Sequence, residues 1–123
     1  MRFKDYFSKD FESTEDNFYP SLRTRYYRAK IGEAKDALLE VIKSEKGSII
    51  DDNETYMETL YECPEYSCTA RIIATSPVEV AIDFKVTTFA FFGFGKGKKV
   101  IENLYQKLDG KLQFKGVGLY KGL

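Results

Sequence analysis

A ligand-binding turn is the chemistry that the sequence indicates most directly. Between Gly93 and Lys99 the chain reads G-F-G-K-G-K-K and leads into a predicted helix. The first turn of a helix has unpaired N–H groups and a partial positive charge, and glycines let the backbone approach a bound anion closely. The candidate anion-binding residues are Gly93, Gly95, Lys96, Gly97, Lys98 and Lys99.

The spacing of these glycines matches neither of two familiar phosphate motifs. A P-loop requires G-x4-G-K-[ST] after a strand, and a dinucleotide fingerprint requires G-x-G-x-x-G in a βαβ unit. The alternative is that the glycines only turn the chain from a strand into a helix. The same stretch includes Phe89, Phe91, Phe92 and Phe94, which are interpreted either as an apolar lid over a small phosphate-bearing or apolar ligand or as a plug for the core.

A second candidate surface lies in the segment Ser21–Lys30, which is basic and contains no acid. Arginines beside tyrosines can attract phosphates and stack on bases, so a single-stranded nucleic acid is a possible ligand. The candidate residues are Arg23, Arg25, Tyr26, Tyr27 and Arg28. The alternative is a charged edge strand that discourages aggregation. We do not expect nucleic acid to be the natural partner, because 19 basic and 19 acidic residues give the chain no net charge.

The composition argues against most enzymatic chemistry. The chain has no histidine, so it lacks the usual proton-transfer group and the commonest transition-metal ligand. Its two cysteines, Cys63 and Cys68, cannot complete a tetrahedral zinc site by themselves, and they lack the tight spacing of a redox pair. We expect two free thiols, no cofactor, no metal and no catalytic activity.

The location of the protein is expected to be cytoplasmic. No run of about eighteen apolar residues exists to span a membrane. The first residues, M-R-F-K-D-Y-F, carry charges where a signal peptide has an apolar core.

One long strand is expected to organise the fold. From Val78 to Phe89 apolar residues alternate with polar ones, so one face of the strand should lie in a core and the face with Asp83 and Lys85 in water. Strands are also expected over 21–30, 48–51, 55–62 and 69–75. Helices are expected over 31–46 and from about residue 100 to residue 109, because apolar residues recur there at helical spacing.

The predicted fold class is therefore α+β, a two-layer sandwich. Its order is β-α-β-β-β-β-α, with one antiparallel sheet of about five strands and two main helices packed on one face. Residues 1–20 form an aromatic and acidic N-terminal arm, or a short helix over about residues 3–11. Residues 21–123 form a single domain.

The expected function is that of a non-catalytic interaction or small-ligand-binding module that self-associates as a homo-oligomer. An acidic block between Gly47 and Tyr66 and a basic block between Lys96 and Lys121 could pair between protomers. The alternatives are binding of an anion or phosphate ligand at Gly93–Lys99 and weak binding of single-stranded nucleic acid at Arg23–Arg28.

Overall fold

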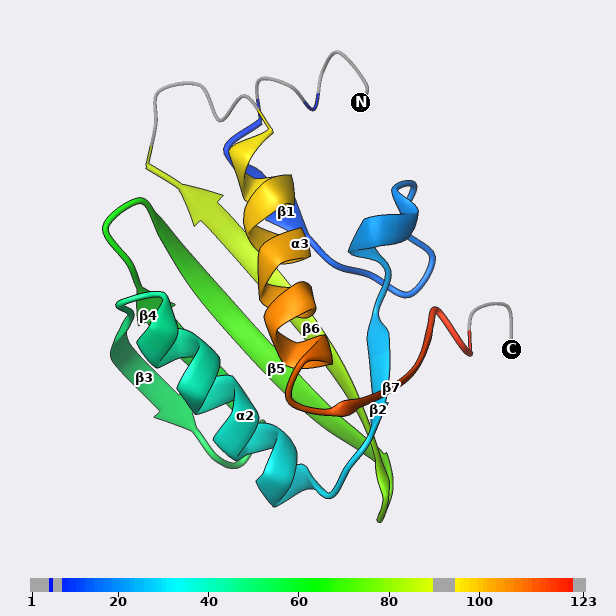
Figure 1. Cartoon of the computed structure of the whole chain (residues 1–123). Coiled ribbons are helices and arrows are strands. Elements are labelled where there is room, and N and C mark those ends of the chain that lie inside the picture. The colour runs from blue at the N-terminus through cyan, green and yellow to red at the C-terminus, as the bar shows by residue number, and fades with distance from the viewer. Residues whose placement is uncertain (1–4, 6–7, 90–94, 121–123) are drawn as a thin grey trace.

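The computed structural model describes residues 5, 8–89 and 95–120 of the chain (Figure 1). Their fold is α+β: one antiparallel sheet of seven strands, with two helices side by side across one of its faces. The strands are β1 (Asp10–Glu12), β2 (Arg25–Arg28), β3 (Ser48–Asn53), β4 (Glu58–Glu62), β5 (Tyr66–Ser76), β6 (Glu79–Thr88) and β7 (Gln113–Val117). The helices are α2 (Ile31–Ser44) and α3 (Lys96–Asp109), and a 3-10 turn, η1 (Pro20–Leu22), precedes β2.

The two longest strands, β5 and β6, form the middle of the sheet. The strand order is β3-β4-β5-β6-β2-β7. β1 pairs with residues 85–87 of β6, beyond the part of β6 that pairs with β2. β1 and β2 pair with the same edge of β6 one after the other, at Phe11↔Val86 and at Arg25↔Ile82. The chain between these two strands remains attached to β6, because the backbone N–H of Ser13 donates to the carbonyl of Phe84 at 2.8 Å.

The predicted fold class is confirmed, whereas the number and order of the strands differ. All five predicted strands are present with changed ends, and the additional strands are the short ones near the chain ends, β1 and β7. Residues 10–12 extend along β6 rather than ending the helix expected over 3–11. The first predicted strand is also shorter, because Pro20–Leu22 forms the 3-10 turn.

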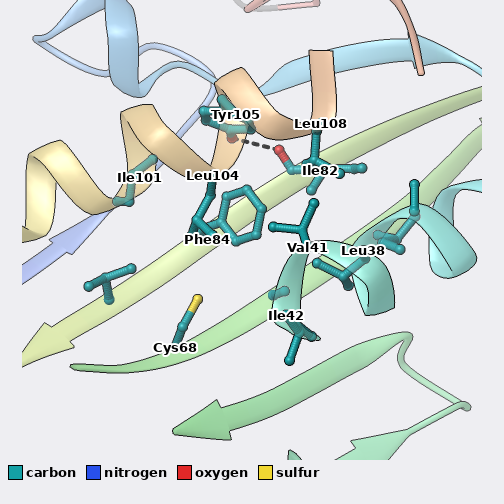
Figure 2. Packing of buried hydrophobic residues seen from close by; sticks show 14 of the residues in the cluster. Leu38, Val41, Ile42, Cys68, Ile82, Phe84, Ile101, Leu104, Tyr105 and Leu108 are labelled. Carbon is teal, nitrogen blue, oxygen red and sulfur yellow. Dashed lines mark hydrogen bonds between the residues drawn. The ribbon is translucent and has the colours of Figure 1, made fainter. Parts of the chain in front are cut away.

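The core lies between the helices and the sheet face that they cover. The alternation in β6 predicts its buried face correctly, since Val80, Ile82, Phe84 and Val86 are all buried. Facing them are apolar side chains from α2 (Ala34, Ala37, Leu38, Val41, Ile42) and α3 (Ile101, Leu104, Tyr105, Leu108). Figure 2 shows Phe84 and Ile82 pointing up from the strand into this layer. Each buried side chain of this size contributes about 1.5–3 kcal/mol of driving force.

The helices leave the opposite face of the sheet uncovered (Figure 1). Along β5 the even-numbered residues from Tyr66 to Ile72 are buried, and the odd-numbered residues are exposed or half-buried. The outward side chains of the sheet are therefore accessible on this open face. None of the helices in the described ranges is long and apolar enough to span a membrane.

Candidate functional site

The open face of the sheet contains a groove of about 800 Å³. Its floor is formed by the outward side chains of β5 and β6, among them Thr69 and Ala81. Residues 12–15, between β1 and η1, form one wall, and Tyr120 lines the end of the groove beyond β7. The groove is built from segments far apart in the chain, and the sheet brings them together.

Asp83 is the most unusual group in this groove. Its Oδ1 accepts hydrogen bonds from Ser13 Oγ at 2.8 Å and from Thr24 Oγ1 at 2.7 Å. Burial raises the pKa of the Asp83 carboxyl above its ordinary value, although the two hydroxyls oppose this shift. A carboxyl group with such a perturbed pKa in a cleft is a candidate functional group.

The second carboxylate oxygen of Asp83 points to the groove. Within the described residues Oδ2 makes no hydrogen bond, and no fully buried side-chain oxygen or nitrogen there lacks a partner. Oδ2 is therefore in contact with solvent, and a ligand can reach it. One oxygen of this acid is fixed by the protein and the other is presented outward.

Two cationic side chains flank Asp83. Arg71 of β5 lies directly opposite Asp83 in the register of the sheet, and Lys85 lies two residues further along β6. Arg71 is nevertheless bonded to Glu58 of β4, its neighbour on the other side, through Nε at 3.0 Å and through Nη2. Arg71 therefore forms its ion pair with Glu58 and not with Asp83, while Lys85 makes no ion pair with any described residue.

The wall of the groove is fastened by Glu15. This carboxylate accepts one hydrogen bond from the Tyr26 hydroxyl at 2.7 Å and another from the backbone N–H of Tyr120 at 2.6 Å. The rings of Tyr26 and Tyr120 meet edge to face, with their centroids 5.1 Å apart. Glu15 thus joins β2, the N-terminal segment and the C-terminal tail at one end of the groove.

The residues of the predicted anion site are only partly brought together. Gly95 lies just before α3 with a φ of 77°, a left-handed conformation that glycine adopts easily. Gly97 is packed against β1, since a Cβ there would lie 2.8 Å from Cδ2 of Phe11. Lys98 bonds Glu102 at 2.8 Å, whereas Lys96 and Lys99 are exposed. Lys96 and Lys98 are about 200° apart around the helix, so these two lysines point to different sides.

Of the four candidate lid residues, the structure describes Phe89, which directly follows β6 and is 53 % exposed. Phe91, Phe92 and Phe94, together with Gly93 of the anion site, lie outside the described residues.

The predicted nucleic-acid surface is divided between the two faces of the sheet. Arg25 points to the helix side, where its guanidinium donates to both carboxylate oxygens of Asp109, at 3.1 and 2.6 Å. Tyr27 is fully buried and Tyr26 is 5 % exposed, so neither ring offers a face for stacking on a base. Arg23 donates from Nε to the carbonyl of Asn17 at 3.0 Å, and Arg28 is exposed.

Sequence reasoning missed the central residues of the groove. The sequence predicted only that Asp83 and Lys85 lie on the water-facing side of their strand, and it indicated no role for Ser13 or Thr24. The alternation of apolar and polar residues in β6 was the available signal, because it places Asp83 between Ala81 and Lys85 on the side of the strand that points away from the helices. Nothing in the local sequence indicates that Ser13, which is 70 residues away, bonds this acid.

No protein-family model matches this chain, and no curated protein is significantly similar to it in sequence.

Proposed function

We propose that this protein is a non-catalytic small-ligand-binding module, and that it binds a small polar molecule in the groove on the open face of its sheet. The observation that carries the proposal is Asp83, which is half-buried at the centre of the groove with one oxygen fixed and the other exposed to a ligand. An acid held in this way can orient a hydrogen-bond donor of a ligand.

The size and lining of the groove support this proposal. Its volume of about 800 Å³ falls within the range of about 300–1,000 Å³ that is typical of small-molecule sites. Ala81 and Ile73 supply apolar surface on the floor, and Asp83, Arg71 and Lys85 supply convergent polar groups. Such a mixture is usual where apolar contact gives affinity and a few polar groups fix orientation.

A fragment screen by NMR tests the proposal. A panel of small polar compounds, including amides, amines, carboxylates and sugars, is added to the labelled protein, and chemical shifts are followed. Binding compounds should shift resonances of Thr69, Arg71 and Asp83, and leave those of the outer face of α2 unchanged.

A matched pair of variants shows whether the groove is the site. Ala81→Phe places a ring on the groove floor and should abolish binding. Ala74→Phe introduces the same side chain at an exposed position of β5 outside the groove, and it should bind as the wild type does. The proposal fails if the panel shifts no groove resonance or if both variants bind equally well.

Self-association remains part of the proposal, with β3 as the surface that favours it. β3 lies at an edge of the sheet, and Ile49 and Ile50 are 47 % and 55 % exposed there. The charged blocks that motivated the expectation pair only in part within the chain, as Asp52 does with Lys35 and Lys111 with Glu40. Four acids of the acidic block, Asp51, Glu54, Glu62 and Glu65, form no ion pair with another described residue. Sedimentation at several concentrations, with Ile50→Lys as the comparison, tests this part. A wild type that stays monomeric at high concentration contradicts it.

The proposed location is the cytoplasm, where a reducing environment keeps thiols free. Cys63 and Cys68 are both free and buried. A fluorescent fusion or cell fractionation tests this location.

A further inference from the structure

A chain of hydrogen-bond contacts runs from Asp83 into the core. It comprises four oxygen–oxygen distances: 2.7 Å from Thr24 to Asp83 Oδ1, 2.8 Å from Asp83 Oδ1 to Ser13, 2.8 Å from Ser13 to Tyr105 and 2.6 Å from Tyr105 to the Ile82 carbonyl. Figure 2 shows the last of these contacts, with Tyr105 of α3 pointing at Ile82. Each distance is that of a normal O–H···O hydrogen bond.

The number of hydrogens available to these four hydrogen bonds depends on whether Asp83 is ionised. Four contacts require four hydrogens, but the three hydroxyls of Thr24, Ser13 and Tyr105 supply only three. The N–H of Phe84 bonds Ser13 Oγ separately, at 2.9 Å, and adds no proton to these four. With an ionised Asp83, Ser13 and Thr24 both donate to Oδ1, and the Tyr105 hydroxyl must share its one hydrogen between Ser13 Oγ at 2.8 Å and the Ile82 carbonyl at 2.6 Å.

A protonated Asp83 satisfies every contact. Two bonds then reverse relative to the ionised arrangement: Oδ1–H donates to Ser13, and Ser13 donates to Tyr105. Thr24 still donates to Oδ1, and Tyr105 donates to the carbonyl of Ile82 alone. Each oxygen then gives and receives within its capacity. In this form Oδ2 is a carbonyl oxygen that faces the groove as a neutral hydrogen-bond acceptor.

We propose that the arrangement around Asp83 is that of a neutral carboxylic acid whose proton completes this chain, and that the groove in this form takes an uncharged ligand group with an N–H or O–H donor. The inference rests on the proposed function of the groove and names the class of ligand. Burial, which raises the pKa of Asp83, acts in the same direction.

Among the groups that surround Asp83, the Arg71 charge favours the ionised acid, but Arg71 is bonded to Glu58 rather than to Asp83. α3 contributes only the Tyr105 hydroxyl to this site, β2 contributes Thr24 and the phenol of Tyr26, and the N-terminal segment contributes carboxylates that oppose ionisation. The other charged and titratable groups that line the groove are Glu12, Glu15, Tyr26, Glu58, Arg71, Lys85 and Tyr120, and Tyr105 approaches Asp83 from the core through Ser13.

The two cations near Asp83 are consistent with an amide-like ligand. Arg71 is bonded to Glu58 through Nε and Nη2, which leaves Nη1 without a hydrogen-bond partner among the described residues. Lys85 is exposed. Both can donate to a carbonyl oxygen of a ligand whose neighbouring N–H is bonded to Asp83 Oδ2. A primary amide carries this donor and acceptor side by side.

Three compounds of nearly equal shape test the ligand class. Benzamide is neutral, benzamidine is a cation and benzoate is an anion. Their affinities are measured from chemical-shift titrations at pH 5 and at pH 8. At pH 5 we expect benzamide to bind at least fivefold more tightly than either charged compound. The ratio of benzamide affinity to benzamidine affinity should fall or stay constant as the pH rises, because an ionised Asp83 favours the cation.

The outcomes separate the inference from the proposed function. Tightest binding of benzamidine at both pH values shows an ionised Asp83 and overturns the inference, while the groove remains a ligand site. Tightest binding of benzoate likewise overturns it, in favour of an anion site at Arg71 and Lys85. If neither these compounds nor the wider panel shifts any groove resonance, the inference and the proposed function both fail.

Asp83→Asn supplies an independent check on the same proton. The asparagine amide can donate from Nδ2 to both Ser13 and Thr24 and present its oxygen to the groove, so it imitates the neutral acid except that Thr24 then accepts instead of donating. We expect benzamide affinity at pH 5 to remain within threefold of the wild type, and the ratio to benzamidine to become independent of pH. A loss of benzamide binding greater than tenfold, with an unchanged fold by NMR, contradicts the inference.

Discussion

Tyr120 donates a hydrogen bond from its hydroxyl to Glu79 at 2.7 Å and thereby ties the C-terminal tail to the start of β6. Glu79 is buried and also accepts from Lys115 of β7 and from Thr75 of β5. The bonds from Lys115, Thr75 and Tyr120, in this order of size, lower the pKa of Glu79 to about 2. One carboxylate thus holds together three segments at the end of the groove.

Acid should weaken this connection. The folded pKa of Glu79 lies below its ordinary value of 4.5, so its stabilising contribution is complete above pH 4.5 and is lost as the pH falls towards about 2. We expect Glu79→Gln to be less stable than the wild type at pH 7, with a difference that disappears near pH 2. Urea unfolding at pH 7, 4.5, 3 and 2 measures it. Tyr120→Phe, which removes one donor, should show a smaller difference. A gap that is the same at every pH would exclude this role for Glu79.

Arg25 should be important for stability rather than for nucleic-acid binding. Its guanidinium forms a two-bond pair with Asp109 and lies 4.0 Å from the ring centroid of Phe114. Hydrogen bonds to charged groups contribute about 1.5–3 kcal/mol, and the side chain is 19 % exposed, so Arg25→Ala should cost about 1–3 kcal/mol. Arg28→Ala, at an exposed position of the same strand, should change stability by less than about 0.5 kcal/mol.

Chemical denaturation of both arginine variants measures these costs. Mobility of a labelled single strand at low salt, measured on the same proteins, compares them as binders. Equal stability of Arg25→Ala and wild type would contradict the structural role. Strong binding that Arg28→Ala abolishes without loss of stability would revive the nucleic-acid hypothesis.

Gly97 should be required for packing rather than for binding an anion. A methyl group there would come within 2.8 Å of the Phe11 ring, so we expect Gly97→Ala to destabilise the fold by about 1–3 kcal/mol. In a Phe11→Ala background the same substitution should cost less, because Cδ2 and Cγ of the ring are gone and only Cβ, at 3.3 Å, remains close. Gly32→Ala in α2 is the matched control, since no atom lies within 4 Å of the added carbon. It should be neutral or stabilising by up to about 1 kcal/mol. Thermal unfolding with and without phosphate separates packing from binding. A phosphate-dependent stabilisation that Gly97→Ala removes would favour the anion site.

Periodicity predicted the parts of the fold that depend on local pattern. The alternation in β6 and the helical stripes of α2 and α3 are encoded within short windows, and all three elements lie where they were expected. β1 was missed because three residues carry too little pattern, and β7 because Gly116 within it and Gly118 just after it weaken the strand signal. Both strands form by pairing with a longer neighbour, β1 with β6 and β7 with β2, and such pairing is a tertiary effect.

The groove was hidden for a related reason. Its polar groups each have an ordinary local explanation: Asp83 as a solvated position, Ser13 as loop and Thr24 as part of a basic strand. Their function as a unit depends on β1 and β2 sharing one edge of β6, which places Ser13 and Thr24 beside the same carboxylate oxygen. Local composition instead drew attention to the glycines and lysines before α3, where Gly97 is a packing residue.

The two cysteines should remain reduced and unreactive in the folded protein. Cys68 lies opposite Tyr61 in the ladder between β4 and β5, and the N–H of Cys63 donates to the carbonyl of Tyr66. The cysteines are therefore diagonal neighbours, for which Cα atoms are about 7–8 Å apart. A disulfide needs about 4.4–6.8 Å, so these two positions do not face each other for bridging.

Burial also suppresses the thiolate form of these cysteines. It raises the pKa of Cys63 and brings that of Cys68 to about 12. At pH 8 the thiolate population of Cys68 should be lower than that of an ordinary thiol by a factor on the order of a thousand. We expect iodoacetamide at pH 8 to modify the native protein very slowly, with Cys63 ahead of the more buried Cys68, and to modify both rapidly in urea. Peptide mass spectrometry of timed samples measures each site. Rapid native alkylation of Cys68, or a Cys63–Cys68 bridge formed by a mild oxidant without unfolding, would contradict the packing described for β4 and β5.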